Sequence, residues 1–261
     1  MTPLRAALSA LTLALPLAAA ADSASHVLDA AAVVRPERAF AFLVDPSAAR
    51  AGTGAFEYRA GFGSGLSADR PLPADLTRAG GSHALSASWS VTSRIAPYAS
   101  ATVYDQGSRV NVAAGARVQL TDPASRLRVA VLAGALREAG GNAGVQLTAA
   151  ASYDAGPVRV AGNVQGEKVF AAGRDALDVL VLAGVSVKVA PAVRLGVEYV
   201  GQDLEALVDP EEAEGGARQL VGPTIAFDVD GGRYQLALGG GLGIGKQSPD
   251  AMVRARLAVN F

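Results

Sequence analysis

Residues 250–261 read Asp-Ala-Met-Val-Arg-Ala-Arg-Leu-Ala-Val-Asn-Phe. Every second residue is apolar, and this set comprises Val253, Ala255, Leu257, Val259 and Phe261. The intervening positions carry Met252, Arg254, Arg256, Ala258 and Asn260. Alternation with a period of two indicates a β-strand with one apolar face and one mostly polar face. Two arginines within such a strand fit a strand that has lipid on one side and a polar lumen on the other.

The same stretch ends on an aromatic residue, Phe261, which is in phase with the apolar face. In this respect the chain resembles bacterial outer-membrane β-barrel proteins, whose last strand shows the same alternation and ends in Phe. The resemblance implies a transmembrane barrel in the cell outer membrane, in contact with outer-membrane lipid. It also implies an assembly signal, read by the barrel-assembly machinery, that consists of Val253, Ala255, Leu257, Val259 and Phe261.

Composition limits the chain to a few classes of protein. Its 261 residues suffice for one large all-β domain, half of them are hydrophobic, and the net charge of -1 argues against nucleic-acid binding. Cysteine is absent, so no disulfides form. Residues 6–21 form an apolar run that follows Arg5 and ends in small residues. This pattern predicts that residues 1–21 are a signal peptide, cleaved near Ala20 or Ala21 on export.

The rest of the chain predicts an all-β, up-and-down antiparallel barrel over residues 54–261. Residues 22–53 fit three placements, namely a periplasmic tail, a segment inside the lumen or an extra edge strand. About twelve strands are expected, with ten or fourteen as alternatives, because most alternating segments have the 9–12 residues that a tilted strand needs to cross a bilayer. Their expected bounds are 55–63, 82–94, 98–104, 109–120, 126–136, 143–153, 158–167, 176–189, 193–201, 219–229, 233–244 and 250–261.

The connections between these strands alternate in length. Strong turn formers mark tight turns after every even-numbered strand except the last, at Pro97, Asp122-Pro123, Gly156-Pro157, Pro191 and Asp230-Gly231-Gly232. Most connections after odd-numbered strands are longer. Bacterial barrels have short periplasmic turns, longer external loops and an even strand number. The pattern therefore places the tight turns in the periplasm.

Many cations occupy the positions opposite the apolar face. The predicted lumen charge cluster consists of Arg117, Arg126, Arg128, Arg159, Lys188, Arg194, Arg233, Arg254 and Arg256. Five of these arginines follow tight turns, with Asp228 as the nearest expected acid. Rings of Arg and Lys favour anions in pores. The alternative is that these charges have no role in transport and are simply solvated or cross-paired inside the lumen.

Catalysis and metal binding find little support. The histidines are His26 and His83. Barrel phospholipases have a serine two residues after the histidine, followed by Asn-Gly, whereas Leu85 stands there in this chain. The acidic segment 203–214 lacks regular ligand spacing, so it predicts a solvated loop. We therefore expect no enzyme activity, no cofactor and no metal site.

Two classes of function remain open from the sequence. The segment 185–227, with the Gly-rich hairpin that follows, is similar to transporter-like barrels associated with aromatic-degradation operons. The first class is a passive channel or small-solute transporter, with small anionic solutes as the expected cargo. The second is a non-conducting barrel for envelope structure or surface interaction.

Overall fold

The computed structural model describes residues 38–47, 49–64, 80–104, 109–138, 141–172, 177–202, 218–244, 248 and 250–261. The predicted signal peptide, residues 22–37 and the acidic segment 203–214 lie outside this set. Among the residues that the structure describes, there is no helix long and apolar enough to span a bilayer.

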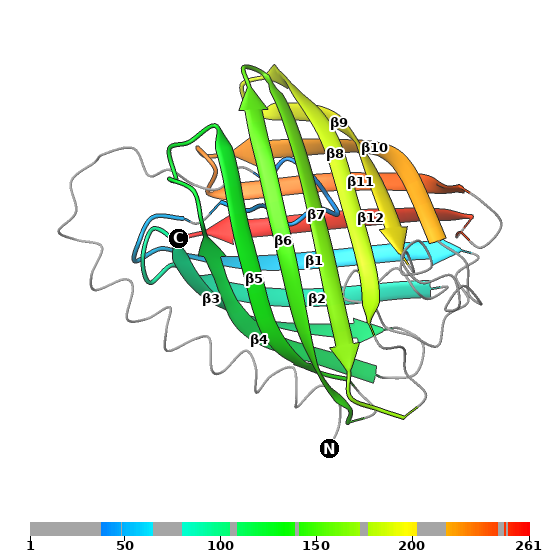
Figure 1. The fold of residues 1–261 in the computed structure, drawn as a ribbon. Helices are drawn as coiled ribbons and strands as arrows, with labels where there is room; N and C mark the ends of the chain where they lie inside the picture. Colours follow the sequence, from blue (N-terminus) through cyan, green and yellow to red (C-terminus); the bar gives the residue numbers. More distant parts are fainter. Residues whose placement is uncertain are drawn as a thin grey trace.

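The described residues form a closed antiparallel barrel of twelve strands (Figure 1). Each strand pairs with its neighbours in sequence, and β1 closes the barrel by pairing with β12. The strands are β1 (Gly54–Ser64), β2 (Gly80–Trp89), β3 (Ile95–Tyr104), β4 (Arg109–Gln119), β5 (Leu127–Arg137), β6 (Ala143–Ala155), β7 (Val158–Val169), β8 (Asp178–Ala190), β9 (Val193–Gln202), β10 (Arg218–Val229), β11 (Tyr234–Ile244) and β12 (Ala251–Asn260). The predicted fold class and strand number are therefore confirmed.

Tight turns gather at one end of the barrel, together with Gly54 and Phe261; we call it the turn end and the opposite one the loop end. Gly156, Gly231 and Gly232 have positive φ angles, which Gly adopts without strain, and Asp230 also has a positive φ. The predicted turn at Pro97 is wrong. Pro97 lies within β3, and the turn occupies residues 90–94, where the Thr92 hydroxyl accepts the N–H groups of Arg94 and Ile95.

The position of Pro97 has a physical reason. The β2–β3 ladder reaches only from Ser82–Tyr104 to Ser88–Tyr98, so Pro97 lies beyond it and pairs with β4 alone. A proline has no N–H group to donate and is tolerated where a neighbouring strand is missing. The hydroxyl of Thr92 provides the turn chemistry instead.

The two faces of β12 follow the predicted alternation. Arg254, Arg256 and Asn260 are buried, whereas Val253 and Leu257 are 59% and 43% exposed. The same division holds on other strands, where the large outward-facing apolar side chains include Leu147, Val164, Val185, Leu195 and Leu238. The barrel thus presents an apolar wall outward and a mixed, largely polar wall inward, as expected of a membrane-spanning barrel.

Phe261 joins the first and last strands at the turn end. Its backbone N–H and C=O pair with those of Gly54, at 3.0 and 2.9 Å. Its ring lies 5.3 Å from the ring of Phe56 and 6.3 Å from that of Trp89, measured between centroids. A Cβ atom at Gly54 would meet this ring at 2.7 Å, so glycine leaves the space that the ring occupies. The terminal residue therefore also closes the seam of the barrel.

Deleting Phe261, or replacing it with Asp, is expected to reduce assembly of the barrel. The yield of membrane-inserted, heat-modifiable protein on unheated gels measures this effect. The double variant Phe56→Ala/Trp89→Ala removes the ring contacts but keeps the terminal residue, and so separates seam packing from the predicted assembly signal. Wild-type insertion after loss of Phe261 would count against both roles.

Candidate pore and its internal loop

Residues 38–47 lie inside the barrel, and we call them the internal loop (Figure 1). Of the three placements that the sequence left open for residues 22–53, this part takes the one in the lumen. Residues Ala39, Phe40, Ala41, Phe42 and Leu43 are all at most 6% exposed. Arg38 donates to Gln235 and Asn260 near the turn end, and Gly52 and Thr53 join the Ser90 backbone at that same end. Arg38 and the segment that follows the loop thus both lie near the turn end.

An apolar strip of the inner wall receives the loop. Phe40, Phe42 and Leu43 belong to one buried cluster with wall residues of β7 to β12. These wall residues are Ala161, Leu180, Leu182, Val200, Leu220, Ala226, Ala237 and Met252. Glycines allow close contact, since a Cβ at Gly184 would lie 2.7 Å from side-chain atoms of both Leu43 and Phe40. Burial of these three large side chains anchors the loop.

Polar side chains of the wall bind the backbone of the loop. The carboxylate of Glu198 accepts three N–H groups, from Ala41 at 2.7 Å, Phe42 at 2.8 Å and Leu43 at 3.2 Å. The Asn163 amide accepts the N–H of Val44 at 2.7 Å and donates to its C=O at 3.0 Å. Buried backbone groups need such partners, because an unpaired one costs about 1–3 kcal/mol. Side chains of the wall therefore satisfy backbone groups of the loop that would otherwise need partners in a β-ladder.

Two arginines of β12 complete the contact. Arg256 donates to the carbonyls of Leu43 at 2.7 Å and Phe40 at 3.3 Å. The guanidinium of Arg254 lies over the ring of Phe42, 5.0 Å from its centroid, in the geometry of a cation–π interaction. The inner side of β7 to β12 is thus occupied by the loop.

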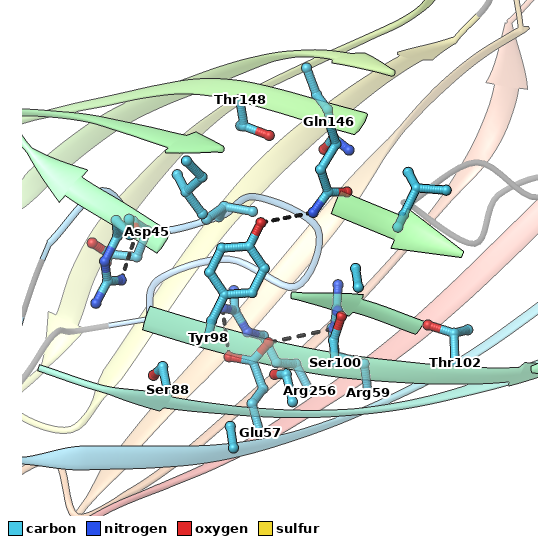
Figure 2. Close-up of a pocket in the computed structure, with 18 of the residues that line it drawn as sticks. Asp45, Glu57, Arg59, Ser88, Tyr98, Ser100, Thr102, Gln146, Thr148 and Arg256 are labelled. Atoms are coloured by element: carbon cyan, nitrogen blue, oxygen red, sulfur yellow. Dashed lines mark hydrogen bonds and ion pairs between the residues drawn. The ribbon is translucent and has the colours of Figure 1, made fainter. Parts of the chain in front are cut away.

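A cavity of about 200 Å³ remains between the loop and the inner wall of β1 to β7 (Figure 2). Its lining extends from Ala55 and Ser88, near the turn end, to Tyr104 and Glu167, near the loop end. Uncharged polar side chains are the largest group on the wall side, and they include Ser86, Ser88, Tyr98, Ser100, Thr102, Asn111, Gln146, Thr148 and Gln165. The cavity therefore follows the strands over most of their length.

Three arginines surround one carboxylate beside this cavity. Glu57 lies 2.7 Å from Arg256, 2.9 Å from Arg38 and 3.5 Å from Arg59. Arg117 donates to the backbone carbonyl of Asp45 at 3.5 Å and so reaches from β4 to the loop. The group around Glu57 has three positive charges and one negative charge.

The predicted lumen cations occupy different environments. Arg117 and Arg256 line the cavity, and Arg254 is buried against Phe42. Arg194 is buried and donates to the carbonyl of Pro157 at 3.2 Å. Arg126, Lys188 and Arg233 are exposed at the turn end. The remaining two, Arg128 and Arg159, both bind Asp154.

Asp154 changes the electrostatics at the turn end. Arg159 donates to it at 2.6 and 3.0 Å, and Arg128 donates to one of the same carboxylate oxygens. The expectation that Asp228 is the acid nearest to these arginines is therefore wrong. The predicted strand ended at Tyr153, whereas β6 continues to Ala155 and turns Asp154 toward Arg128 and Arg159. Asp154 stands two residues after Ser152, so the alternation of the strand could have assigned it to the same inner face.

Other expectations concern catalysis and metals. His83 Nδ1 lies 2.7 Å from the hydroxyl of Tyr58, and the two rings stack at 6.1 Å. Among the described residues, no three His, Asp or Glu side chains are grouped so that they could hold a metal ion. The absence of enzyme activity stays a prediction.

No protein-family model matches the chain, and no curated protein matches it. Several solved structures are similar to it. The structure described as the KdgM porin in complex with disordered oligogalacturonate has a TM-score of 0.55 at 8% identity, covering 79% of this chain and 98% of the other. Omp33 of Acinetobacter baumannii has a TM-score of 0.51 at 9% identity, covering 80% and 98%. The chain therefore has the fold of outer-membrane β-barrel porins.

Proposed function

We propose that this protein is a passive channel for small polar solutes across the outer membrane. The observation that carries this proposal is the cavity beside the internal loop, whose lining runs from near the turn end to near the loop end. Hydroxyl and amide side chains replace part of the hydration of a polar solute without binding it tightly, which passage through a pore requires. Lipid contacts the apolar outer wall, and the assembly machinery is the expected partner during insertion.

Conductance of the purified protein in planar bilayers tests this function. A matched pair of variants on β4 makes the test specific: Ala113 lines the cavity, and its neighbour Ala114 is exposed on the outer face. Ala113→Trp is expected to lower single-channel conductance and slow the swelling of liposomes in sugar solutions, whereas Ala114→Trp should leave both at parent values. A correctly folded parent without conductance would favour the second class of function, a non-conducting barrel.

We further propose a preference for small anions. Support comes from the group around Glu57, where three arginines face one carboxylate beside the cavity. Unit charges several ångströms apart interact by about 1–3 kcal/mol at an effective dielectric constant near 20, so an excess of positive charge attracts anions appreciably. Asp154 pairs with Arg128 and Arg159 and so offsets part of the positive charge at the turn end. The proposed anion preference therefore rests on the group around Glu57.

Arg59→Gln is expected to reduce the anion preference of the channel. Arg59 has the longest of the three ion pairs with Glu57, at 3.5 Å, and Figure 2 shows it beside the cavity. Reversal potentials in a potassium chloride gradient measure the preference, which should also weaken near 1 M salt, where the screening length falls to about 3 Å. Arg126→Gln, at an exposed turn, is the control. Equal reversal potentials in the parent and Arg59→Gln would contradict this assignment.

A further inference from the structure

Four residues on neighbouring strands form a row across the inner wall, opposite the internal loop. Tyr98 of β3 pairs with Gly115 of β4, Gly115 with Gly134 of β5, and Gly134 with Gln146 of β6. All four share one height and one face of the barrel, because each is the direct cross-strand partner of the next. The two central members have no side chain. The row therefore leaves a bare strip of backbone between Tyr98 and Gln146.

The side chain of Tyr98 spans this strip. Gln146 Nε2 donates a hydrogen bond to the Tyr98 hydroxyl at 2.8 Å, and Figure 2 shows the phenol directed from its own strand toward Gln146. A Cβ atom at Gly134 would lie 2.6 Å from the Tyr98 hydroxyl oxygen, which is closer than real Cβ contacts. A Cβ at Gly115 would lie 2.1 Å from the carbonyl oxygen of Ala133. Gly134 thus leaves the space that the phenol occupies, and Gly115 leaves the space that the backbone of β5 occupies.

Both Tyr98 and the internal loop line the cavity, so their separation helps to determine its width. We propose that Tyr98, held along the wall by Gln146, is the residue that sets the size limit of the channel. This inference rests on the proposed function. Its basis is separate from the charges near Glu57, because the row around Tyr98 is uncharged. If the phenol leaves the wall, it can turn only toward the cavity, since the β-strand itself blocks the other side.

The inference makes different predictions for removing the ring and for releasing it. Tyr98→Ala removes the ring and is expected to raise single-channel conductance about 1.5-fold, because conductance grows with the free width of a pore. It should also admit sugars that the parent excludes in liposome swelling. Tyr98→Phe and Gln146→Leu keep the ring but remove its hydrogen bond. Both should lower mean conductance and add open-channel noise, as the ring moves into the cavity.

Two controls separate these effects from general damage. Tyr153→Ala makes the same substitution on the outer face, where Tyr153 is 48% exposed, and should leave conductance unchanged. Heat-modifiable migration verifies that each variant forms a barrel, and Tyr98→Phe, which loses one oxygen atom, covers the case in which Tyr98→Ala does not fold.

The outcomes distinguish this inference from the proposed function. Parent-like conductance in Tyr98→Ala, or parent-like noise in both Tyr98→Phe and Gln146→Leu, overturns the role of Tyr98 and leaves the channel intact. A parent that does not conduct overturns the proposed function, and this inference with it.

Discussion

Arginine at position 114 is expected to destabilise the folded barrel by about 2–4 kcal/mol, the cost of a charged side chain on the lipid face near the bilayer midplane. Ala114 lies near the middle of β4 and is exposed on the outer wall. Arginine at position 113, one residue away, should cost much less. Ala113 lines the cavity, where a guanidinium keeps water and polar partners. The two variants differ only in the face that carries the charge.

Urea-induced unfolding in lipid vesicles measures both free energies of unfolding, and Ala114→Gln separates the charge from the size of the side chain. Glycines 184 and 196 are unsuitable inward sites for this comparison. A Cβ at Gly184 meets Leu43 and Phe40 at 2.7 Å, and one at Gly196 meets the carbonyl oxygen of Val185 at 2.5 Å. Equal costs at positions 113 and 114 would mean that the outer wall does not face lipid.

Release of the internal loop is the second large effect that we expect. Phe→Ala and Leu→Ala changes in a packed core each cost about 2–5 kcal/mol, so Phe40→Ala/Leu43→Ala removes a large part of the energy that docks the loop. The barrel should survive, because its twelve strands satisfy their backbone groups by pairing with one another. Release of the loop would free the part of the lumen beside β7 to β12 in addition to the cavity. Conductance should then rise severalfold, and anion preference should change.

Glu198→Gln tests the same docking through the backbone. The carboxylate accepts N–H groups at both oxygens, whereas an amide has only one acceptor oxygen. We expect conductance that fluctuates between the parent level and a larger one. The control for the double variant Phe40→Ala/Leu43→Ala is Phe62→Ala, which truncates a phenylalanine on the outer face that is 55% exposed. Parent conductance in the double variant would show that the loop does not restrict the pore.

Features that depend only on residues close together in the chain could be predicted from the sequence. Alternation in 250–261 indicated β12 and assigned Arg254 and Arg256 to the inner face, and the same pattern located the other eleven strands. Turn chemistry at Asp230-Gly231-Gly232 located a tight turn within one or two residues. These features are local, because the pleat alternates with every residue and a turn is set by its own φ angles.

The occupant of the lumen, in contrast, became visible only in the folded barrel. Local alternation places Leu180, Leu182 and Val200 on the inner face, in phase with Lys188 and Arg194, but it does not show that an apolar partner covers them there. A nearly continuous apolar run in β8 was the available signal, since such runs indicate strands that are buried on both faces. The positions of Leu43 and Val44 depend on Glu198 and Asn163, which are more than 100 residues away in the chain.

The row of Tyr98, Gly115, Gly134 and Gln146 was likewise decided by the tertiary structure. It exists only because three successive strand pairs adopt one register, and a shift of one residue in any of them would turn its members to opposite faces. The sequence specifies each strand, but register is set where strands meet. The width of the pore is therefore a property of the closed barrel and its internal loop together.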